Sequence, residues 1–318
     1  MKEVGIRSIS SYSPEHKLTN ADLEKMVDTT DEWIVTRTGI SERRIAKDIS
    51  TSGMAIKAAK KAVDQAGIPI EDYAFTISST VTPELSCPAQ ACLVGQSVGL
   101  TNGFCFDLNA ACSGMLYTMA IGADQLKLHQ GKAGLITASE KMSVMLDYTD
   151  RASCILFGDG ASAMVLTTEP PYHKILHYEL GADPSGAHFV QMGGRENHGN
   201  EEMRNFRQDG RAVFRFAVTK LKALLISLKE KAGVGPEDRF FVIPHQANLR
   251  MIENVAKDLD ISMDHFVMNI QTHGNTSSAS IGLAMAEATE QGLFQSGDKL
   301  LLAGFGGGLT WGAAIIEW

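Results

Sequence analysis

The segment Phe106-Asp-Leu-Asn-Ala-Ala-Cys112-Ser-Gly114 runs from an apolar strand pattern through small residues into a helix pattern. It predicts a strand-to-helix elbow, with a helix that starts at about Cys112. The unpaired N–H groups and the positive dipole end of such a helix favour a thiolate, which is the nucleophilic form of cysteine. We therefore predict that Cys112 is a nucleophile, whose own backbone N–H could also face an oxyanion.

Strand and helix patterns alternate on both sides of this elbow. In the first half, strands are expected at 74–79, 105–108 and 135–138, and helices at 51–66, 88–98 and 113–128. In the second half, strands are expected at 175–180, 240–243 and 300–303, and helices at 211–232, 249–259 and 277–291. This alternation predicts βαβ units and a largely parallel sheet. Because the same alternation occurs again after residue 170, the sequence predicts two similar halves, 1–170 and 171–318.

Two glycine motifs support the repeat. Phe157-Gly-Asp-Gly160 leads into an apolar strand at the end of the first half, and Phe305-Gly-Gly-Gly308 leads into one at the end of the chain. The first motif loosely matches the dinucleotide-binding fingerprint, which requires a helix after it. Because a strand at 163–166 follows instead, we expect no nicotinamide or flavin site and interpret the glycines as tight turns with close backbone contacts.

Composition narrows the class of protein. The chain has 318 residues, of which 44% are hydrophobic and 21% charged, as expected for a globular protein with two core-forming units. Five cysteines without CxxC spacing fit a reducing compartment and need neither disulfide nor metal, and we interpret Cys87, Cys92, Cys105 and Cys154 as buried structural thiols. The absence of a signal or membrane-spanning pattern makes the cytoplasm the expected location. A net charge of -8 argues against nonspecific nucleic-acid binding.

Two further segments carry candidate catalytic side chains. His245 directly follows the apolar run 240–243, at the carboxyl end of a strand, where open α/β sheets build ligand sites. Asn275 lies among small polar residues before an apolar helix, a pattern that capping alone would explain. Together with Cys112 and the glycine turn at 304–308, these residues form a set of nucleophile, imidazole, amide donor and flexible turn.

Five motifs in order resemble those of the β-ketoacyl-acyl carrier protein synthase III family, a thiolase-fold group of condensing enzymes. They are Asn109-Ala-Ala-Cys112-Ser-Gly114, Gly158-Asp-Gly-Ala161, Pro244-His-Gln-Ala-Asn248, Gly274-Asn-Thr-Ser277 and Gly306-Gly-Gly-Leu-Thr-Trp-Gly312. The likeness covers essentially the whole chain. It implies a layered α-β-α-β-α sandwich of two βαβαβ halves with pseudo-twofold symmetry, and a homodimer.

The resemblance also implies a two-step reaction. Cys112 takes an acyl group from acyl-CoA and passes it to the carbanion that forms when malonyl-acyl carrier protein loses carbon dioxide. His245 and Asn275 donate hydrogen bonds to the malonyl thioester oxygen, while the backbone N–H groups of Cys112 and Gly307 hold the oxyanion of the first step. No cofactor is expected beyond the coenzyme A thioester, and no metal.

Binding residues follow from the same resemblance. For coenzyme A it implies that Trp33 and Arg151 sandwich the adenine, that Arg37 meets phosphate, and that the pantetheine channel is lined by Gly210, Phe214 and Asn248. A basic patch of Arg215, Arg250 and Lys257 docks the acidic carrier protein. The acyl pocket is formed by Met142, Phe157 and Cys87. Cys87 stands where the compared family member has a bulky aromatic that reaches into the partner subunit, so longer or branched primers are expected.

Several alternatives share part of this pattern. A papain-like protease has the same Cys, His, Asn order but lacks the surrounding motifs, and an intact triad argues against a catalytically silent acyl-CoA-binding protein. Thiolases need a second cysteine near the last glycine turn, and elongating synthases use two histidines. His273 is ambiguous in that respect, but the Gly-Asn-Thr-Ser match assigns the role to Asn275. Hydroxymethylglutaryl-CoA synthase and plant-type polyketide synthases are usually longer, and polyketide-type initiation with another primer or malonyl-CoA remains the main alternative.

Overall fold

The computed structural model describes residues 3–128, 132–193, 205–235 and 238–318. Its first half contains the elements β1 (Gly5–Tyr12), α3 (Thr51–Ala66), β4 (Tyr73–Ser79), α4 (Gln90–Ser97), β5 (Phe104–Leu108), α5 (Gly114–Leu128), β6 (Ala133–Lys141) and β7 (Asp159–Thr167). Its second half contains β8 (His173–Ala182), α8 (Gly210–Ala232), β11 (Phe240–Pro244), α9 (Leu249–Asp258), α11 (Ser280–Glu290), β12 (Lys299–Gly306) and β13 (Thr310–Glu317). The predicted boundary at 170/171 falls between β7 and β8.

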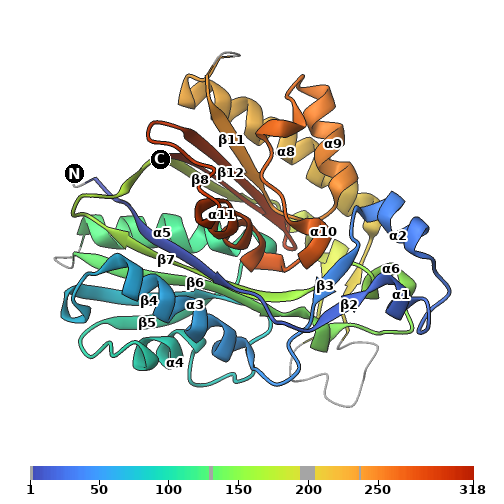
Figure 1. Ribbon diagram of the computed structural model, residues 1–318, viewed down its shortest axis with the longest axis horizontal. Coiled ribbons are helices and arrows are strands. Elements are labelled where there is room, and N and C mark those ends of the chain that lie inside the picture. The colour runs from blue at the N-terminus through green and yellow to red at the C-terminus, as the bar shows by residue number, and fades with distance from the viewer. Residues whose placement is uncertain (1–2, 129–131, 194–204, 236–237) are drawn as a thin grey trace.

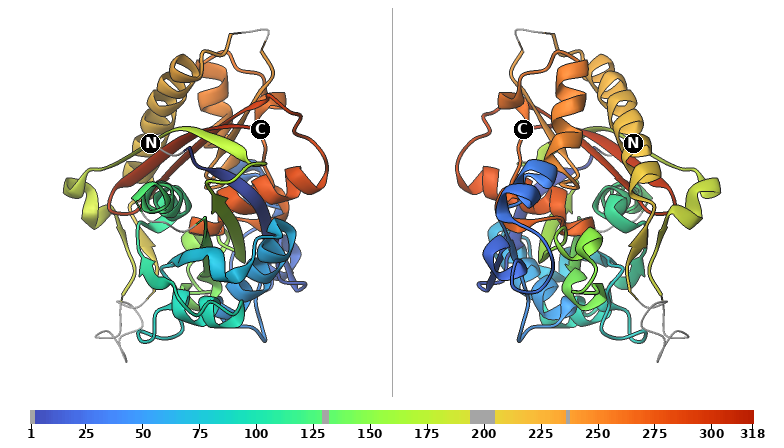
Figure 2. Two further views of the ribbon diagram at one scale, coloured as in Figure 1. Left: turned by 90° about the vertical axis from the view of Figure 1, so that its left-hand side faces the viewer. Right: turned by 90° about the vertical axis from the view of Figure 1, so that its right-hand side faces the viewer.

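The elements stack in five layers (Figure 1). Helices α3 and α4 pack on the outer face of the first set of strands, and α8 and α9 form a separate core with the outer face of the second set. Between the two sets of strands lie α5 and α11, whose side chains share one core with both. The side views keep α8 and α9 on one side of the molecule and α3 on the other (Figure 2). The predicted layered thiolase-like architecture is therefore confirmed.

The strand order repeats between the halves. The first half reads β5-β4-β6-β7-β1, and the second reads β11-β12-β13-β8. Strand β4 is parallel to both β5 and β6, and β11 is parallel to β12, whereas in each half the remaining pairs are antiparallel, so the expectation of a largely parallel sheet is wrong. The strand that would match β5 is reduced to a single parallel bridge between Val242 and Phe266. The two halves therefore share one strand order, and the strand that matches β5 is shortened in the second half.

The two sets of strands are also joined, which the sequence did not indicate. Strands β1 and β8 pair at two positions, Gly5 with Lys174 and Ile6 with His173. This short ladder makes one continuous nine-stranded sheet. Because α5 and α11 fill the space between the two halves of the sheet, pairing is confined to the ends of β1 and β8.

Local chemistry sets the helix ends close to their predicted positions. The Ser50 side chain accepts from the N–H of Gly53 at the start of α3, and Gly67 ends the helix with a φ of 62°. Asp209 caps α8 in the same way, and Gly233 ends it with a φ of 65°. No helix of the described residues is long and apolar enough to cross a membrane.

Two of the expected buried thiols lie on the surface. Cys154 is buried and Cys105 half-buried, but Cys87 and Cys92 are exposed, so the prediction of a buried structural role is wrong for both of them. Cys92 lies on α4 next to β5, which is the last strand of the sheet. No further strand of the described chain covers that edge, which is why an apolar sequence pattern here does not lead to burial.

Candidate active site

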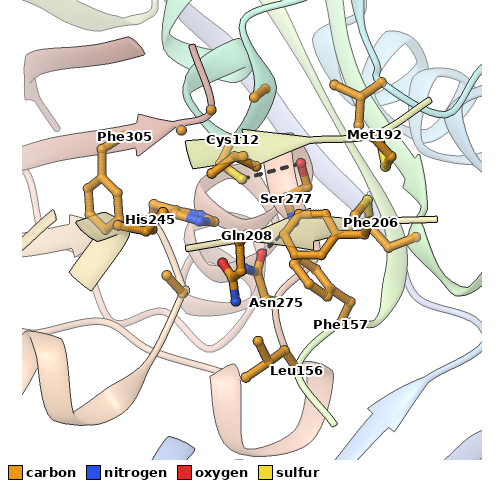
Figure 3. A pocket seen from close by; sticks show the side chains of 18 of the residues that line it. Cys112, Leu156, Phe157, Met192, Phe206, Gln208, His245, Asn275, Ser277 and Phe305 are labelled. Carbon is orange, nitrogen blue, oxygen red and sulfur yellow. Dashed lines mark hydrogen bonds between the residues drawn. The ribbon is translucent and has the colours of Figure 1, made fainter. Parts of the chain in front are cut away.

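Cys112, His245 and Asn275 line one cavity of about 420 Å³. They come from three distant segments: the turn after β5, the residue after β11, and the loop before α11. Figure 3 shows the three side chains converging, with the Cys112 thiol beside Ser277 and the His245 ring directed toward them. The arrangement brings a thiol, an imidazole and an amide within reach of one bound molecule.

The elbow at Cys112 is tighter than a simple helix start. Residues Ala111–Ser113 form a 3-10 turn, α5 itself begins at Gly114, and Ala111 has a positive φ of 46°. The Cys112 Sγ lies 3.5 Å from the Ser277 hydroxyl oxygen. The strand end and the helix are therefore connected as predicted. In addition, Ala111 adopts a strained backbone conformation directly before Cys112, which lines the cavity.

The expectation of a stabilised thiolate is wrong for this structure. Cys112 keeps some surface toward the cavity, yet burial of its thiol raises the pKa to about 12. The hydrogen bond with Ser277 lowers this pKa and the charge of Glu140 raises it further, but both effects are smaller than desolvation. Because loss of water around the thiol is the largest effect, the resting group at physiological pH is a neutral thiol.

His245 is buried and fixed on several sides. Its backbone N–H donates to the carbonyl of Ala303 at 2.8 Å, and its ring meets Phe305 edge to face with centroids 5.3 Å apart. The ring atom Nδ1 lies 2.7 Å from the Ser280 hydroxyl oxygen. Burial lowers the pKa of His245 to about 3, so the imidazole is neutral at physiological pH.

Asn275 is held by its backbone and by its own side-chain oxygen. Its N–H donates to Leu156 at 2.9 Å, and its carbonyl accepts from Gly158 at 3.1 Å. The side-chain Oδ1 accepts from the N–H of Ser277 at 2.8 Å, which leaves the Nδ2 amide group available to donate to a ligand. A Cβ on Gly158 would lie 2.1 Å from the His273 carbonyl oxygen, which confirms that this glycine permits close backbone contact.

The last glycine turn lies against the nucleophile. A Cβ on Gly306 would lie 2.6 Å from the backbone nitrogen of Cys112, so only glycine fits there. Gly307 lines the cavity beside Cys112, with its missing Cβ directed at Val190. The two residues expected to form the oxyanion hole, Cys112 and Gly307, therefore belong to the same wall.

The expected coenzyme A contacts fall into two groups. Gly210, Phe214 and Asn248 line the cavity, whereas Trp33, Arg37 and Arg151 form a separate cluster. The guanidinium carbon of Arg151 lies 4.6 Å from the Trp33 ring centre, and that of Arg37 lies 5.3 Å from it. Since Arg151 stacks directly on Trp33, an adenine enters between them only if Arg151 moves. Asn248 connects the two groups by donating to the Arg37 carbonyl at 3.0 Å.

Two of the three expected acyl-pocket residues, Met142 and Phe157, line the cavity, and Cys87 does not. The apolar walls that the sequence left unassigned include Val81, Leu156, Val190, Met192, Phe206, Val213, Phe216, Met251, Phe305 and Leu309. Phe206 packs on Phe157 with ring centroids 4.6 Å apart. Several of these walls belong to the segment 184–208, which is rich in glycine, asparagine and charged residues. Its central residues 194–204 lie outside the described part.

The expected carrier-protein patch is on the outer surface. Arg215 lies on α8, and Arg250 and Lys257 lie on α9, all three with exposed side chains. Helices α8 and α9 pack against each other. Within the described residues, none of the three forms an ion pair with a carboxylate, so their charges are available to a partner.

Glu140 is a buried carboxylate that the sequence did not single out. It accepts hydrogen bonds from the N–H of Val81 at 3.0 Å and from the hydroxyls of Thr82 at 2.8 Å, Thr80 at 3.3 Å and Ser278 at 2.6 Å. Burial raises its pKa to about 7, although these hydrogen bonds act in the opposite direction. A charged residue at the end of a strand pattern is usually solvated, so no local pattern indicates this network.

Comparison with known proteins identifies relatives along the whole chain. Family models described as 3-oxoacyl-(acyl-carrier-protein) synthase III match residues 106–184 and, for its C-terminal part, residues 229–318. The beta-ketoacyl-(acyl-carrier-protein) synthase III 1 of Bacillus anthracis is 43% identical over 99% of both chains. The crystal structure of 3-oxoacyl-(acyl-carrier-protein) synthase III from Aquifex aeolicus is 41% identical with a TM-score of 0.92, covering 99% of this chain and 100% of that one. A priming beta-ketosynthase from a polyketide pathway is 30% identical with a TM-score of 0.92, covering 99% and 96%.

Proposed function

The chain belongs to the β-ketoacyl-(acyl-carrier-protein) synthase III family of thiolase-fold acyltransferases, and we propose that Cys112, His245 and Asn275 carry out its reaction. Members of this family initiate fatty acid synthesis by decarboxylative condensation. The observation that carries the assignment is the convergence of thiol, neutral imidazole and free amide group on one cavity. A second histidine or a second cysteine would suit a different condensation chemistry.

In the first step the Cys112 sulfur attacks the thioester carbonyl of acyl-CoA. The new carbon-sulfur bond forms as the bond to the coenzyme A sulfur breaks, and the thiol proton ends on that sulfur, so the exchange is balanced. The backbone N–H groups of Cys112 and Gly307 stabilise the oxyanion between them. Loss of one such donor typically costs about 100-fold in rate. The neutral resting thiol means that attack and proton loss are coupled.

In the second step the malonyl group of the carrier protein loses carbon dioxide. The electron pair of the broken carbon-carbon bond passes to the thioester, and the resulting enolate oxygen accepts hydrogen bonds from His245 and Asn275. The carbanion then attacks the acyl group on Cys112, and the released sulfur takes up a proton. Both donors are neutral, so neither forms an ion pair with the malonyl carboxylate that would stabilise it before carbon dioxide leaves.

The test is a sequence of two measurements on the intact protein. Incubation with acyl-CoA, followed by intact mass and peptide mapping, should place one acyl group on Cys112. Subsequent addition of malonyl-acyl carrier protein should release carbon dioxide and a 3-oxoacyl product. Lack of acylation at Cys112 would overturn the nucleophile assignment, and carbon dioxide release that persists unchanged in His245→Ala would overturn the donor assignment.

Substrate binding is proposed along the same channel. The pantetheine arm lies past Gly210, Phe214 and Asn248, which line the cavity, and the adenine binds at Trp33 after Arg151 moves aside, with Arg37 near a phosphate. The exposed charges of Arg215, Arg250 and Lys257 suit an acidic carrier protein. An acyl-accepting thiol must stay reduced, which fits the cytoplasm. No cofactor beyond the thioester is needed for these steps.

A second copy of the chain is the proposed partner at the free edge of the sheet. Strand β5 is the last strand in the order, yet all of its residues are only half-exposed or less, and they include Phe104, Cys105 and Phe106. An apolar edge strand is a template for pairing with another chain. A homodimer through β5 would cover the exposed Cys92 and bring Cys87 of one subunit toward the cavity of the other.

Polyketide-type initiation is the second candidate, because the structure of a priming beta-ketosynthase from a polyketide pathway matches nearly the whole chain. The same catalytic residues would serve both reactions. The acceptor distinguishes them: carbon dioxide release only with malonyl-acyl carrier protein of fatty acid synthesis supports the first, and comparable turnover with malonyl-CoA or another carrier protein supports the second.

A further inference from the structure

The donor role of His245 depends on which ring nitrogen carries its single proton. Burial keeps the imidazole neutral, with a pKa of about 3. A neutral ring has one N–H, and the partner of the other nitrogen decides where it is. Only the Nε2–H form can donate into the cavity while Nδ1 faces Ser280. The bonding of Ser280 therefore determines whether His245 is a donor or an acceptor.

The surroundings of the Ser280 hydroxyl fix the direction of its hydrogen bond. Its oxygen lies 2.7 Å from His245 Nδ1. The backbone N–H of Gln246 also approaches this oxygen, at 3.4 Å, and an N–H group can only donate. Among the described residues no other acceptor bonds the hydroxyl. The hydroxyl hydrogen is thus directed to Nδ1, which must be unprotonated, and the ring proton is on Nε2.

We propose that Ser280 is a positioning residue that holds His245 as the Nε2–H tautomer for enolate stabilisation. This inference rests on the proposed function of His245. Ser280 is the first residue of α11 and is 1% exposed, so water cannot readily replace its hydroxyl. The edge-to-face contact with Phe305 restricts the ring plane, and Ser280 fixes the proton. Ring orientation and tautomer are thereby set by two different elements.

The same short segment orients the second donor. Ser277 donates its N–H to Asn275 Oδ1 and so points the Nδ2 group outward, while Ser280 directs the proton of His245. Both hydrogen-bond donors of the decarboxylation step are therefore preorganised by residues 277–280. The acylation step uses neither of these contacts, because its oxyanion is held by backbone N–H groups. Loss of Ser280 should therefore separate the two steps.

The experiment compares Ser280→Ala with unmodified protein and with Ser162→Ala. Ser162 is a matched control, because it is also a buried serine whose hydroxyl contacts the start of α11, at the Ala279 carbonyl, without touching a catalytic side chain. We expect Ser280→Ala to lower kcat for malonyl decarboxylation at least tenfold with little change in KM, and to acylate Cys112 within twofold of the normal rate. Ser162→Ala should keep both rates.

A spectroscopic measurement on unmodified protein tests the tautomer directly. With 15N-labelled histidine, the His245 signals, identified by their absence in His245→Asn, should show an unprotonated Nδ1 and a protonated Nε2. A protonated Nδ1 would overturn the proposal, as would equal loss of acylation and decarboxylation in Ser280→Ala. If unmodified protein failed to acylate Cys112 or to release carbon dioxide, the proposed function itself would fail, whereas the tautomer result would stand on its own.

Discussion

At the scale of single residues, the hydrogen bond that the Asn275 side-chain oxygen makes within the protein determines which amide atom can meet a substrate. Because Oδ1 accepts from Ser277, only Nδ2 can meet a substrate, and it can only donate. The oxygen thus acts like a cap on the 3-10 turn Ser277–Ala279, while the Nδ2 group on the other side of the amide stays available to a substrate. The same bond makes a nearly isosteric test of the donor possible.

Asn275→Asp keeps the oxygen that accepts from Ser277 and replaces the donor Nδ2 with a second oxygen. We expect decarboxylation of malonyl-acyl carrier protein to fall about 100-fold, as is typical when one donor to a developing oxyanion is lost. Acylation of Cys112 by acyl-CoA should stay within a few-fold. Single-turnover acylation and carbon dioxide release measure the two steps separately. An equal loss in both would contradict the assigned division of labour.

At the scale of elements, Glu140 connects the end of β6 to the 80–82 turn and to Ser278. The network braces the wall behind Cys112, since Ser278 directly follows the residue that contacts the thiol. A buried carboxyl in this place has a consequence for folding. Burial raises its pKa from 4.5 to about 7, so between these values the unfolded chain is ionised while the folded protein holds a proton.

Glu140 should therefore make the protein less stable as pH rises from about 5 to 7. The free energy of unfolding falls by up to about 1.4 kcal/mol per pH unit in this window, because the folded state binds one more proton, and the loss levels off above pH 7. In Glu140→Gln this contribution is absent. Urea unfolding at pH 5, 6, 7 and 8 should show the stability advantage of the unmodified protein over Glu140→Gln shrinking with pH.

The exposed Glu253 on α9 supplies the control for this series. Glu253→Gln should show a stability difference from the unmodified protein that barely depends on pH. If the advantage of the unmodified protein over Glu140→Gln stayed constant, or grew as pH rose from 5, Glu140 would be ionised in the folded state. In that case its four hydrogen bonds would outweigh its burial.

At the scale of the whole molecule, the net charge of -8 coexists with the exposed basic side chains of Arg215, Arg250 and Lys257 on α8 and α9. Lys257→Glu should raise KM for malonyl-acyl carrier protein roughly tenfold at low salt, and less at high salt, because charge complementarity is screened. KM for acyl-CoA should not change. Lys60→Glu, on α3 in the opposite outer layer, is the control. Equal effects of both substitutions would assign the loss to net charge alone.

The acyl pocket belongs to the same scale, since Cys87 is exposed and lies away from the cavity of its own chain. If β5 pairs with β5 of a second copy, Cys87 of the partner subunit borders the acyl pocket. Cys87→Phe should then lower the rate with a branched five-carbon acyl-CoA at least tenfold more than with acetyl-CoA, while Cys87→Ser should change neither. Competing initial rates measure the preference. A strong preference of the unmodified protein for acetyl-CoA would defeat the hypothesis.

Much of this protein was determined by local sequence pattern. Helix and strand periodicity placed α3, α8 and β11 within a residue or two of their observed bounds, because capping residues and apolar spacing act over one or two turns. The elbow at Cys112, the strand-end position of His245 and the polar loop at Asn275 are equally local. The motifs at these positions resemble one family, and that resemblance indicated decarboxylative condensation among the several reactions that a reactive cysteine could carry out.

Tertiary structure alone decided the rest. Cys112 is a neutral thiol because neighbouring elements remove water from it, an effect that the helix dipole of its own segment cannot reveal. Glu140, Ser277 and Ser280 acquired their partners only when segments more than thirty residues apart packed together. The joined sheet and the exposed edge at Cys92 likewise depend on where β1 meets β8 and where β5 ends the order. Sequence pattern specifies which groups are present, and packing specifies their hydration, protonation and direction.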